Sequence, residues 1–149
     1  MVAYQVERFL SVMGEIKPLL EQHWQEIAVH KDRFPLNPDY EKYEIMDKMG
    51  ILHIVTARED GVLIGYFISF VMPHLHYRDC IFAMNDILFI AKKHRHGSLG
   101  TKLIYHAKEE LKKIGAHRLC LHVKIDHDFG PLLERMGFEC TEKNYEILL

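Results

Sequence analysis

The feature that most constrains the fold is a run in which an apolar strand, a short basic turn and an amphipathic helix follow one another. The strand is predicted from about Cys80 to Ala91, and it leads into the turn Lys92-Lys93-His94-Arg95-His96-Gly97. A helix is predicted from about Ser98 to Ile114, because apolar residues recur there at helical spacing and charged residues fill much of the rest. This succession is typical of a sheet with helices packed on its faces.

The order of the remaining elements indicates an α/β fold class. Before this run, strands are predicted at Tyr4 to Phe9, Ile51 to Arg58 and Val62 to Met72, with helices at Leu10 to Ala28 and Asn37 to Met49. After it come a strand at His117 to Lys124, a helix at Phe129 to Met136 and a closing pair of strands from Phe138 to Leu148. Together they predict a single mixed central sheet of about six to seven strands flanked by about four helices.

Local signals mark several of these boundaries. Asp60-Gly61 lies between two apolar runs, which is a strong signal for a β-hairpin. Asn37 followed by Pro38 is typical of the start of a helix, and Gly50 can end that helix in a left-handed conformation. Pro18 can split or kink the first helix.

Length and composition indicate one domain over residues 1–149. The chain is 48% hydrophobic, enough to fill one core, and it has no repeat and no linker rich in Pro, Gly or Ser. Its longest apolar stretch, Val62 to Met72, has about half of the roughly 20 residues that a membrane-spanning helix needs, so no membrane association is expected. The first residues lack the order of a signal peptide, which predicts a cytoplasmic protein.

Charge and metal-binding residue types narrow the function classes. A formal net charge of −2 gives no overall basic field, so nucleic acid is not an expected partner; a nucleic-acid-binding domain would rest on Lys92 to His96 alone. The 11 histidines form no H-E-x-x-H motif and there is no paired C-x-x-C, so no metal is predicted. Cys80, Cys120 and Cys140 are predicted to be reduced core thiols.

The turn before the helix of residues 98–114 has the chemistry of an anion site. The first N–H groups of a helix lack partners within it, and the helix dipole favours negative charge there. Small residues let phosphate approach the backbone, and Arg95 offers a guanidinium suited to phosphate. A solvated basic turn is the alternative. A nucleotide P-loop is excluded, because it needs four residues between its glycines and a lysine directly after the second.

This segment resembles the cofactor motif of the GNAT N-acetyltransferases, Q/R-x-x-G-x-G/A. Arg95 stands at the first position and Gly100 at the last, while Ser98 replaces the middle glycine. Two further matches keep the family order: the Asp60-Gly61 hairpin, and Gly137-Phe138 after the predicted last helix. The resemblance therefore covers nearly the whole chain and implies the GNAT fold. The turn from Pro73 to Tyr77 also resembles a subgroup that bacteriophages often carry.

The resemblance implies that the acetyl group of acetyl-CoA is transferred directly to a primary amine on a small molecule or peptide. Phe89 and Ile90 would pair with the pantetheine arm, where their strand splays from the next one. The pyrophosphate would lie on Arg95, His96, Gly97, Ser98, Leu99, Gly100 and Thr101. A regulator of the same fold that binds acetyl-CoA or CoA without turnover is the alternative, and homodimer formation stays open.

Asp86 is the candidate general base. It lies four residues before Ile90, so that period two would place both on one strand face. A carboxylate in an apolar strand is costly to bury unless a partner or a water-filled cleft receives it. The alternative is a structural hydrogen bond to a neighbouring loop, or to His74 or His76.

Two further positions follow from the resemblance. The family often carries a tyrosine four residues before the glycine of G-F to protonate the leaving thiolate, and here that position is Leu133. Tyr145 can substitute if the last strand turns it inward, with core packing as the alternative. His74, His76 and Tyr77 are candidates for the acceptor mouth, with an ordinary polar turn as the alternative. The identity of the acceptor amine does not follow from the sequence.

Overall fold

A mixed sheet of five strands forms the centre of the molecule, in a computed structural model that describes residues 1–149. The strands are β1 (Val2–Val6), β2 (Leu52–Glu59), β3 (Val62–His74), β4 (Tyr77–Ile90) and β5 (Arg118–Cys120), in the spatial order β1-β2-β3-β4-β5. All neighbours are antiparallel except β4 and β5, which are parallel. The crossover between these two carries a helix, as a parallel connection requires.

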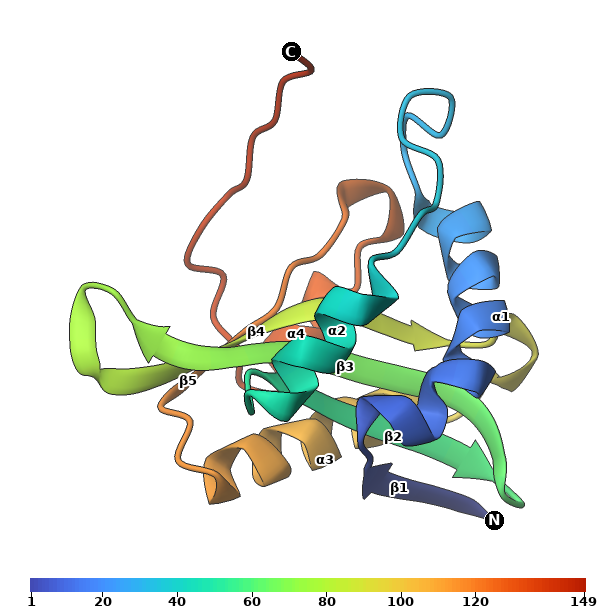
Figure 1. The fold of residues 1–149 in the computed structure, drawn as a ribbon, viewed down its shortest axis with the longest axis horizontal. Coiled ribbons are helices and arrows are strands. Elements are labelled where there is room, and N and C mark those ends of the chain that lie inside the picture. Colours follow the sequence, from blue (N-terminus) through green and yellow to red (C-terminus); the bar gives the residue numbers. More distant parts are fainter.

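Four α-helices cover the two faces of the sheet (Figure 1). They are α1 (Phe9–Ile27), α2 (Tyr40–Lys48), α3 (Leu99–Lys113) and α4 (Gly130–Arg135), with short 3₁₀ turns η1 (Lys92–His94) and η2 (Ile125–His127). Helix α1 continues through Pro18 as one helix and is not split there. No helix combines the length and the apolar character that crossing a bilayer requires.

Buried side chains form one main cluster on each face of the sheet. The α1-side core consists of Phe9, Val12, Ile16, Leu19, Leu20, Leu52, Ile54, Leu63, Tyr66, Ile68, Phe89 and Ala91. The α3-side core consists of Val55, Ala57, Ile64, Phe67, Ile90, Leu103, Ile104, Ala107 and Leu133. Strand β3 contributes to both, because successive side chains on a strand point to opposite faces. The α/β fold class and the four flanking helices are therefore confirmed.

Several local predictions are also confirmed. Asp60 and Gly61 have φ values of 49° and 85°, the pair of positive angles that a two-residue hairpin turn of type I′ needs. Gly50 has a φ of 71°, as expected for the left-handed stop after α2. The predicted helix start at Asn37-Pro38 is wrong by a few residues, because the cap of α2 is Asp39, whose Oδ1 accepts a hydrogen bond from the Lys42 N–H at 2.9 Å.

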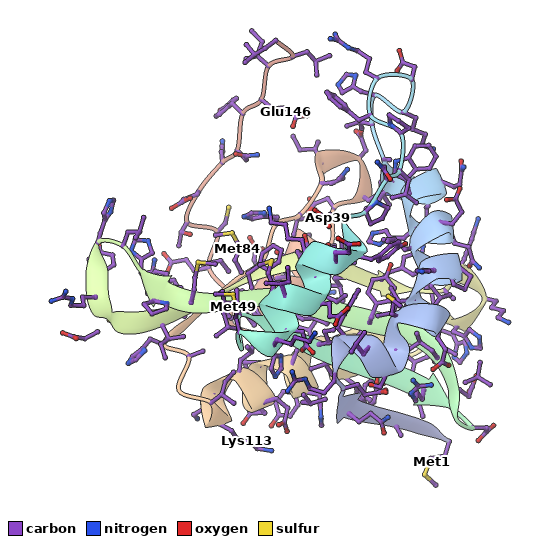
Figure 2. All side chains as sticks on the ribbon, viewed as in Figure 1. Met1, Asp39, Met49, Met84, Lys113 and Glu146 are labelled. Carbon is purple, nitrogen blue, oxygen red and sulfur yellow. The ribbon has the colours of Figure 1, made fainter.

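The predicted sheet of six to seven strands is wrong, since the closing pair from Phe138 to Leu148 does not form. Apolar residues alternate at the end of the chain, but a strand also needs an edge with which to exchange backbone hydrogen bonds. Here Tyr145 and Ile147 are 87% and 81% exposed, and the segment runs away from the sheet (Figure 1). Figure 2 shows the side chain of Glu146 well away from the rest of the molecule.

Candidate active site

A β-bulge in β4 determines where Asp86 points. Ile68 of β3 pairs with Ile87, and the next residue, Ser69, pairs with Asn85, so Asp86 is the extra residue of the bulge. A bulge interrupts the alternation of side chains along a strand and can re-aim one of them. Asp86 consequently faces α2, where its Oδ2 accepts a hydrogen bond from the hydroxyl of Tyr43.

The expectation that Asp86 and Ile90 share one strand face is therefore wrong. Ile90 belongs to the α3-side core, whereas Tyr43, the partner of Asp86, packs against the α1-side core. The rule of period two holds only for a regular strand, and the extra residue at the bulge reverses the phase between these two positions.

The Asp86–Tyr43 pair is half-buried, and burial governs its protonation. Burial raises the pKa of Asp86 above its ordinary value, while the hydrogen bond from Tyr43 acts in the opposite direction. Burial, and after it the hydrogen bond to Asp86, raises the pKa of Tyr43. Tyr43 therefore stays protonated and donates, and Asp86 is a carboxyl group that takes up a proton more readily than a solvated aspartate.

Strand β4 separates from its parallel neighbour just before Asp86. The pairing with β5 extends only from Phe82 to Met84. At the next residue a side chain replaces the backbone as the acceptor: Asn85 Oδ1 accepts a hydrogen bond from the His122 N–H at 2.6 Å. Beyond this point no backbone hydrogen bond joins β4 to the segment that follows β5. The C-terminal end of β4 therefore has a free edge at Phe89 and Ile90, where no neighbouring strand pairs with it.

The side chain of Arg95 lies against this free edge. Its Nε donates to the carbonyl of Ile90 at 2.7 Å, and its terminal nitrogens bind the carboxylate of Glu26 on α1. The guanidinium also lies 5.0 Å from the centre of the Phe89 ring. All hydrogen bonds of the Arg95 side chain therefore go to Ile90 and Glu26. None goes to the backbone of the turn that was expected to hold phosphate.

The start of α3 leaves a row of backbone donors free. No side chain caps this helix, and no acceptor within the chain pairs with the N–H groups of Gly97, Ser98, Leu99, Gly100 and Thr101. Gly97 adopts a φ of 62°, which brings the chain into the helix. A Cβ placed on Gly100 would meet only Ile90 Cδ1, at 3.8 Å. His96 and the residues around it are exposed, so an anion can reach these donors.

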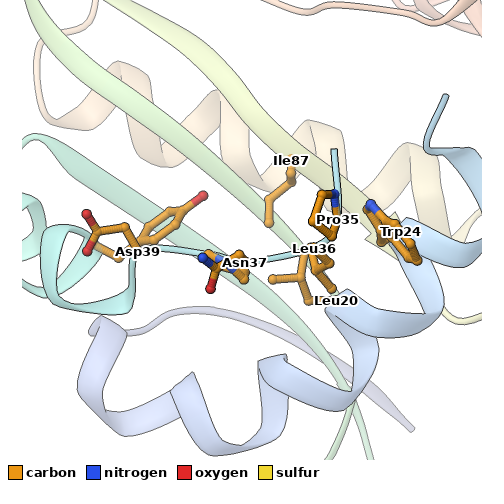
Figure 3. A pocket seen from close by; sticks show the side chains of 9 residues that line it. Leu20, Trp24, Pro35, Leu36, Asn37, Asp39 and Ile87 are labelled. Carbon is orange, nitrogen blue, oxygen red and sulfur yellow. The ribbon is translucent and has the colours of Figure 1, made fainter. Parts of the chain in front are cut away.

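Two hollows that share Asp39 and Tyr43 open on the α2 side of the sheet, and Figure 3 shows the larger one. The larger, of about 400 Å³, lies between α1, the segment before α2, and β4; its lining residues are Leu20, Trp24, Pro35, Leu36, Asn37, Pro38, Asp39, Tyr43 and Ile87. The smaller, of about 200 Å³, is lined by Asp39, Lys42, Tyr43, Met46 and Phe70. Both are lined by Asp39 and Tyr43, and Tyr43 is the residue that bonds to Asp86.

Sequence reasoning did not identify the residues of these hollows. Trp24 and Leu20 carry the apolar spacing of an ordinary helix, and the signals around Asn37 and Pro38 predict only where a helix starts. Tyr43 likewise reads as an apolar position of α2. Nothing in the local pattern indicates that three separate segments meet at Asp86.

The residues predicted for the acceptor mouth lie elsewhere. His74, His76 and Tyr77 form the far end of the β3–β4 hairpin, where the His74 ring stacks on Tyr77 at 5.0 Å. Nine residues of extended strand separate Tyr77 from Asp86, a distance of about 30 Å at the usual rise of a strand. The two histidines bond to each other, through His76 N–H and His74 Nδ1 at 3.1 Å, and neither bonds to Asp86.

The other predicted residues also stay apart from the cleft. Tyr145 is exposed in the C-terminal segment, and no hydrogen bond joins it to another residue. Leu133 is buried in the α3-side core. The three cysteines are unpaired; Cys80 and Cys120 are half-buried, but Cys140 is exposed and is not a core thiol as predicted. No group of three or more His, Cys, Asp or Glu side chains could hold a metal ion.

Solved structures share this fold along the whole chain. They include a ribosomal-protein-alanine N-acetyltransferase from Brucella melitensis biovar Abortus 2308, with a TM-score of 0.74, 20% identity, and coverage of 100% of this chain and 99% of that one. A predicted acetyltransferase with acetyl-CoA from Clostridium acetobutylicum gives a TM-score of 0.73, 15% identity, and coverage of 99% and 96%. An aminoglycoside acetyltransferase with sisomicin, from an uncultured soil metagenomic sample, gives 0.75, 14%, and again 99% and 96%.

The sequence comparisons are more specific. No curated protein matches the chain at a significant level. The model of the acetyltransferase (GNAT) family, in contrast, matches residues 16–138, which is most of the chain and extends from α1 through Gly137-Phe138. Since the family match includes the free β4 edge, the start of α3 and Asp86, and since the fold agrees, the chain belongs to the GNAT family of acetyltransferases.

Proposed function

We propose that the protein transfers the acetyl group of acetyl-CoA to a primary amine, with Asp86 as the group that takes or relays the proton of the amine. The observation that carries this proposal is the position of Asp86, which the β4 bulge turns toward Tyr43, a residue that lines the hollow beside α2. On the same strand, a few residues later, lies the free edge at Phe89 and Ile90. A donor and an acceptor could therefore meet along β4.

The residues around the start of α3 fit the cofactor. The free N–H groups from Gly97 to Thr101 would hold the pyrophosphate, with the dipole of a 15-residue helix behind them. The free edge at Phe89 and Ile90 would pair with the pantetheine arm in the manner of an added strand. When bound, acetyl-CoA would supply the acetyl group as an activated thioester. The family membership and the acetyl-CoA of the Clostridium acetobutylicum structure support this assignment.

In this proposal Arg95 has a different role from the one expected. Its bonds to Ile90 and Glu26 tie the end of β4 to α1, so Arg95 positions the turn and the free N–H groups meet the phosphate. The carbonyl oxygen of Ile90 has two lone pairs, so it could accept from Arg95 Nε and from a pantetheine N–H at the same time.

A base is needed because the acceptor amine must lose a proton before it can attack the thioester. An alkyl ammonium group has a pKa of about 10, and only its neutral form is nucleophilic. Burial raises the pKa of Asp86 toward neutrality, which makes it a stronger base than a solvated aspartate, and Tyr43 keeps its carboxylate oriented. A free backbone N–H on the β4 edge could donate to the carbonyl oxygen that gains charge during transfer.

Replacing Asp86 tests the proposal. Asp86→Asn keeps the size and can still accept the hydrogen bond from Tyr43, but it is not basic. We expect kcat for CoA release with a panel of primary amines, peptides, polyamines and aminoglycosides to fall by about a hundredfold to ten-thousandfold. We expect the acetyl-CoA Kd, measured by calorimetry, to change less than about twofold. Activity should recover toward alkaline pH, where free amine is abundant.

The matched control is Asp79→Asn, an exposed aspartate on the same strand, which should leave the rate unchanged. A folded Asp86→Asn protein with a normal rate and an unaltered pH profile would return Asp86 to a structural role. No observation favours a regulator that binds CoA without turnover, and the same assay separates it from the enzyme. A cytoplasmic site of action, a homodimer and the bacteriophage-type subgroup stay predictions.

A further inference from the structure

The larger hollow has two chemically different ends. Figure 3 shows Trp24, Pro35, Leu36 and Leu20 together at one end and Asp39 at the other. The apolar end is formed by rings and aliphatic side chains whose only polar side-chain group is the indole N–H of Trp24. Asp39 and Tyr43 line both hollows, and the Tyr43 hydroxyl donates a hydrogen bond to Asp86. The site therefore suits a molecule with one apolar end and one amine.

The charges around the hollows set a limit on the charge of the occupant. Asp39 is the only charged residue in the lining of the larger hollow. Lys42 lines the smaller one, and Lys31 lies with its Nζ 5.4 Å from the centre of the Trp24 ring. An ammonium group near Asp39 would meet a carboxylate, but further ammonium groups on the same molecule would come close to one of these lysines.

The apolar end also discriminates against hydroxyl-rich molecules. Several hydroxyl groups that lose water against Leu20, Trp24 and Leu36 would find one side-chain donor there, the indole N–H, and no side-chain acceptor, and this is unfavourable. An aromatic or aliphatic body gains from the same contact, and a ring can also stack on the indole. A volume of about 400 Å³ is within the range of small-molecule sites.

We propose that the acceptor is a monoamine carried on an apolar or aromatic body, and that Trp24 is the residue that selects it. The apolar body packs between Trp24 and Leu20, and the amine lies at the end formed by Asp39 and Tyr43, within reach of Asp86. Polyamines and aminoglycosides are poor acceptors. This inference rests on the proposed acetyl transfer and adds the class of substrate.

The test uses two readouts, because Trp24 is the only tryptophan of the chain and reports directly on the hollow. The probes are 2-phenylethylamine, ethylamine and sisomicin, each with acetyl-CoA at saturation for turnover, or with CoA for binding. We expect kcat/KM for CoA release with 2-phenylethylamine to exceed that with either other amine by at least about tenfold. We also expect 2-phenylethylamine to shift the emission of Trp24 in a saturable way. A preference for sisomicin, or turnover of 2-phenylethylamine without any change in Trp24 emission, would overturn the inference.

A variant pair separates selection from folding. Trp24→Ala should lower kcat/KM for 2-phenylethylamine by about tenfold and that for ethylamine by less than about twofold. Tyr105→Ala, an aromatic truncation at an exposed position of α3, should change neither. An equal loss for both amines in Trp24→Ala would refute the selecting role. If that variant does not fold, the emission titration of the wild type decides. Saturable binding of 2-phenylethylamine without turnover of any amine would support the hollow as an amine site and refute the transferase function.

Discussion

His23 should make the stability of this protein sensitive to mild acid. The side chain lies on α1 and is only 4% exposed; its Nδ1 is 3.0 Å from the hydroxyl of Tyr66, and its ring stacks on Phe89 at 4.7 Å. Burial lowers the pKa of His23 from 6.5 to about 4, and the positive charges of Arg95 and Lys124 act in the same direction. The folded chain therefore keeps His23 neutral at a pH where the unfolded chain protonates it.

The loss of stability can be calculated from the interval between the pKa values of His23 in the unfolded and the folded chain. Between pH 6.5 and about 4 the unfolded chain binds a proton at His23 that the folded chain does not, so the free energy of unfolding falls as the pH falls. The stability is fully present above pH 6.5. Over the whole interval the loss is about 3 kcal/mol, since one pKa unit corresponds to about 1.4 kcal/mol. A typical domain has a total stability of only about 5–15 kcal/mol, so this loss is large.

Urea unfolding at several values between pH 7.5 and 4 measures this loss. His23→Gln can keep a hydrogen bond to Tyr66 but does not titrate, so its stability should fall by about 3 kcal/mol less than that of the wild type over the interval. The comparison is needed because burial also lowers the pKa of His53, which both proteins retain. His76→Gln, at the exposed hairpin end, is the control and should follow the wild type. If His23→Gln and the wild type lose stability in parallel, the reasoning is refuted.

Three further substitutions test the region around β4. Gly65→Ala would bring a Cβ to 2.7 Å from the Phe89 carbonyl oxygen, so we expect a loss of about 1–3 kcal/mol in thermal unfolding and weaker acetyl-CoA binding; an unchanged Tm would contradict this close approach. Gly100→Glu should fold normally but raise the acetyl-CoA Kd at least about tenfold, since it puts bulk and negative charge at the free N–H groups, and unchanged binding would put the phosphate elsewhere. Asp86→Asn should raise the Tm at pH 7, because burial raises the pKa of Asp86 and its ionised form destabilises the folded chain above both pKa values; a lower Tm would speak against that shift.

The parts of the fold that the sequence predicted well are those with local causes. The hairpin at Asp60-Gly61 depends on two residues that tolerate positive φ, and α3 depends on apolar spacing within one helix. The family match depends on short motifs of the same kind, and it is confirmed. The closing strands from Phe138 to Leu148 were predicted from alternation alone, and alternation does not say whether a sheet edge is within reach.

The candidate site was harder to predict because its geometry depends on pairing between strands. Asp86 was singled out as a carboxylate in an apolar strand, but the face predicted for it was wrong, since a bulge appears only when β4 is set against β3. Tyr43 and Trp24 were not identified, because they come from two helices that meet only in the folded chain. Arg95 was expected at phosphate from its guanidinium donors and its place in the cofactor motif, and the carboxylate that engages it, Glu26, is distant in sequence.

The register in which β3 pairs with β4 determines the direction in which the Asp86 side chain points. Before the bulge, Ala83 packs with Leu111 of α3, and Met84 pairs with Phe70 on the α1 side. After the bulge, odd-numbered residues such as Phe89 face the α1 side instead, so the bulge lets both Asp86 and the residue after it face the hollows.

A slip of one residue would turn Asp86 to the α3 side of the sheet, away from the Tyr43 hydroxyl. Gly65 opposes such a slip, because it is the residue paired with Ile90 and a side chain there would collide with the Phe89 carbonyl oxygen and with Ile90. In a slipped register a larger residue of β3 would have to occupy this close approach. The glycine that lets the end of β4 lie close to β3 therefore also fixes which way the candidate base points.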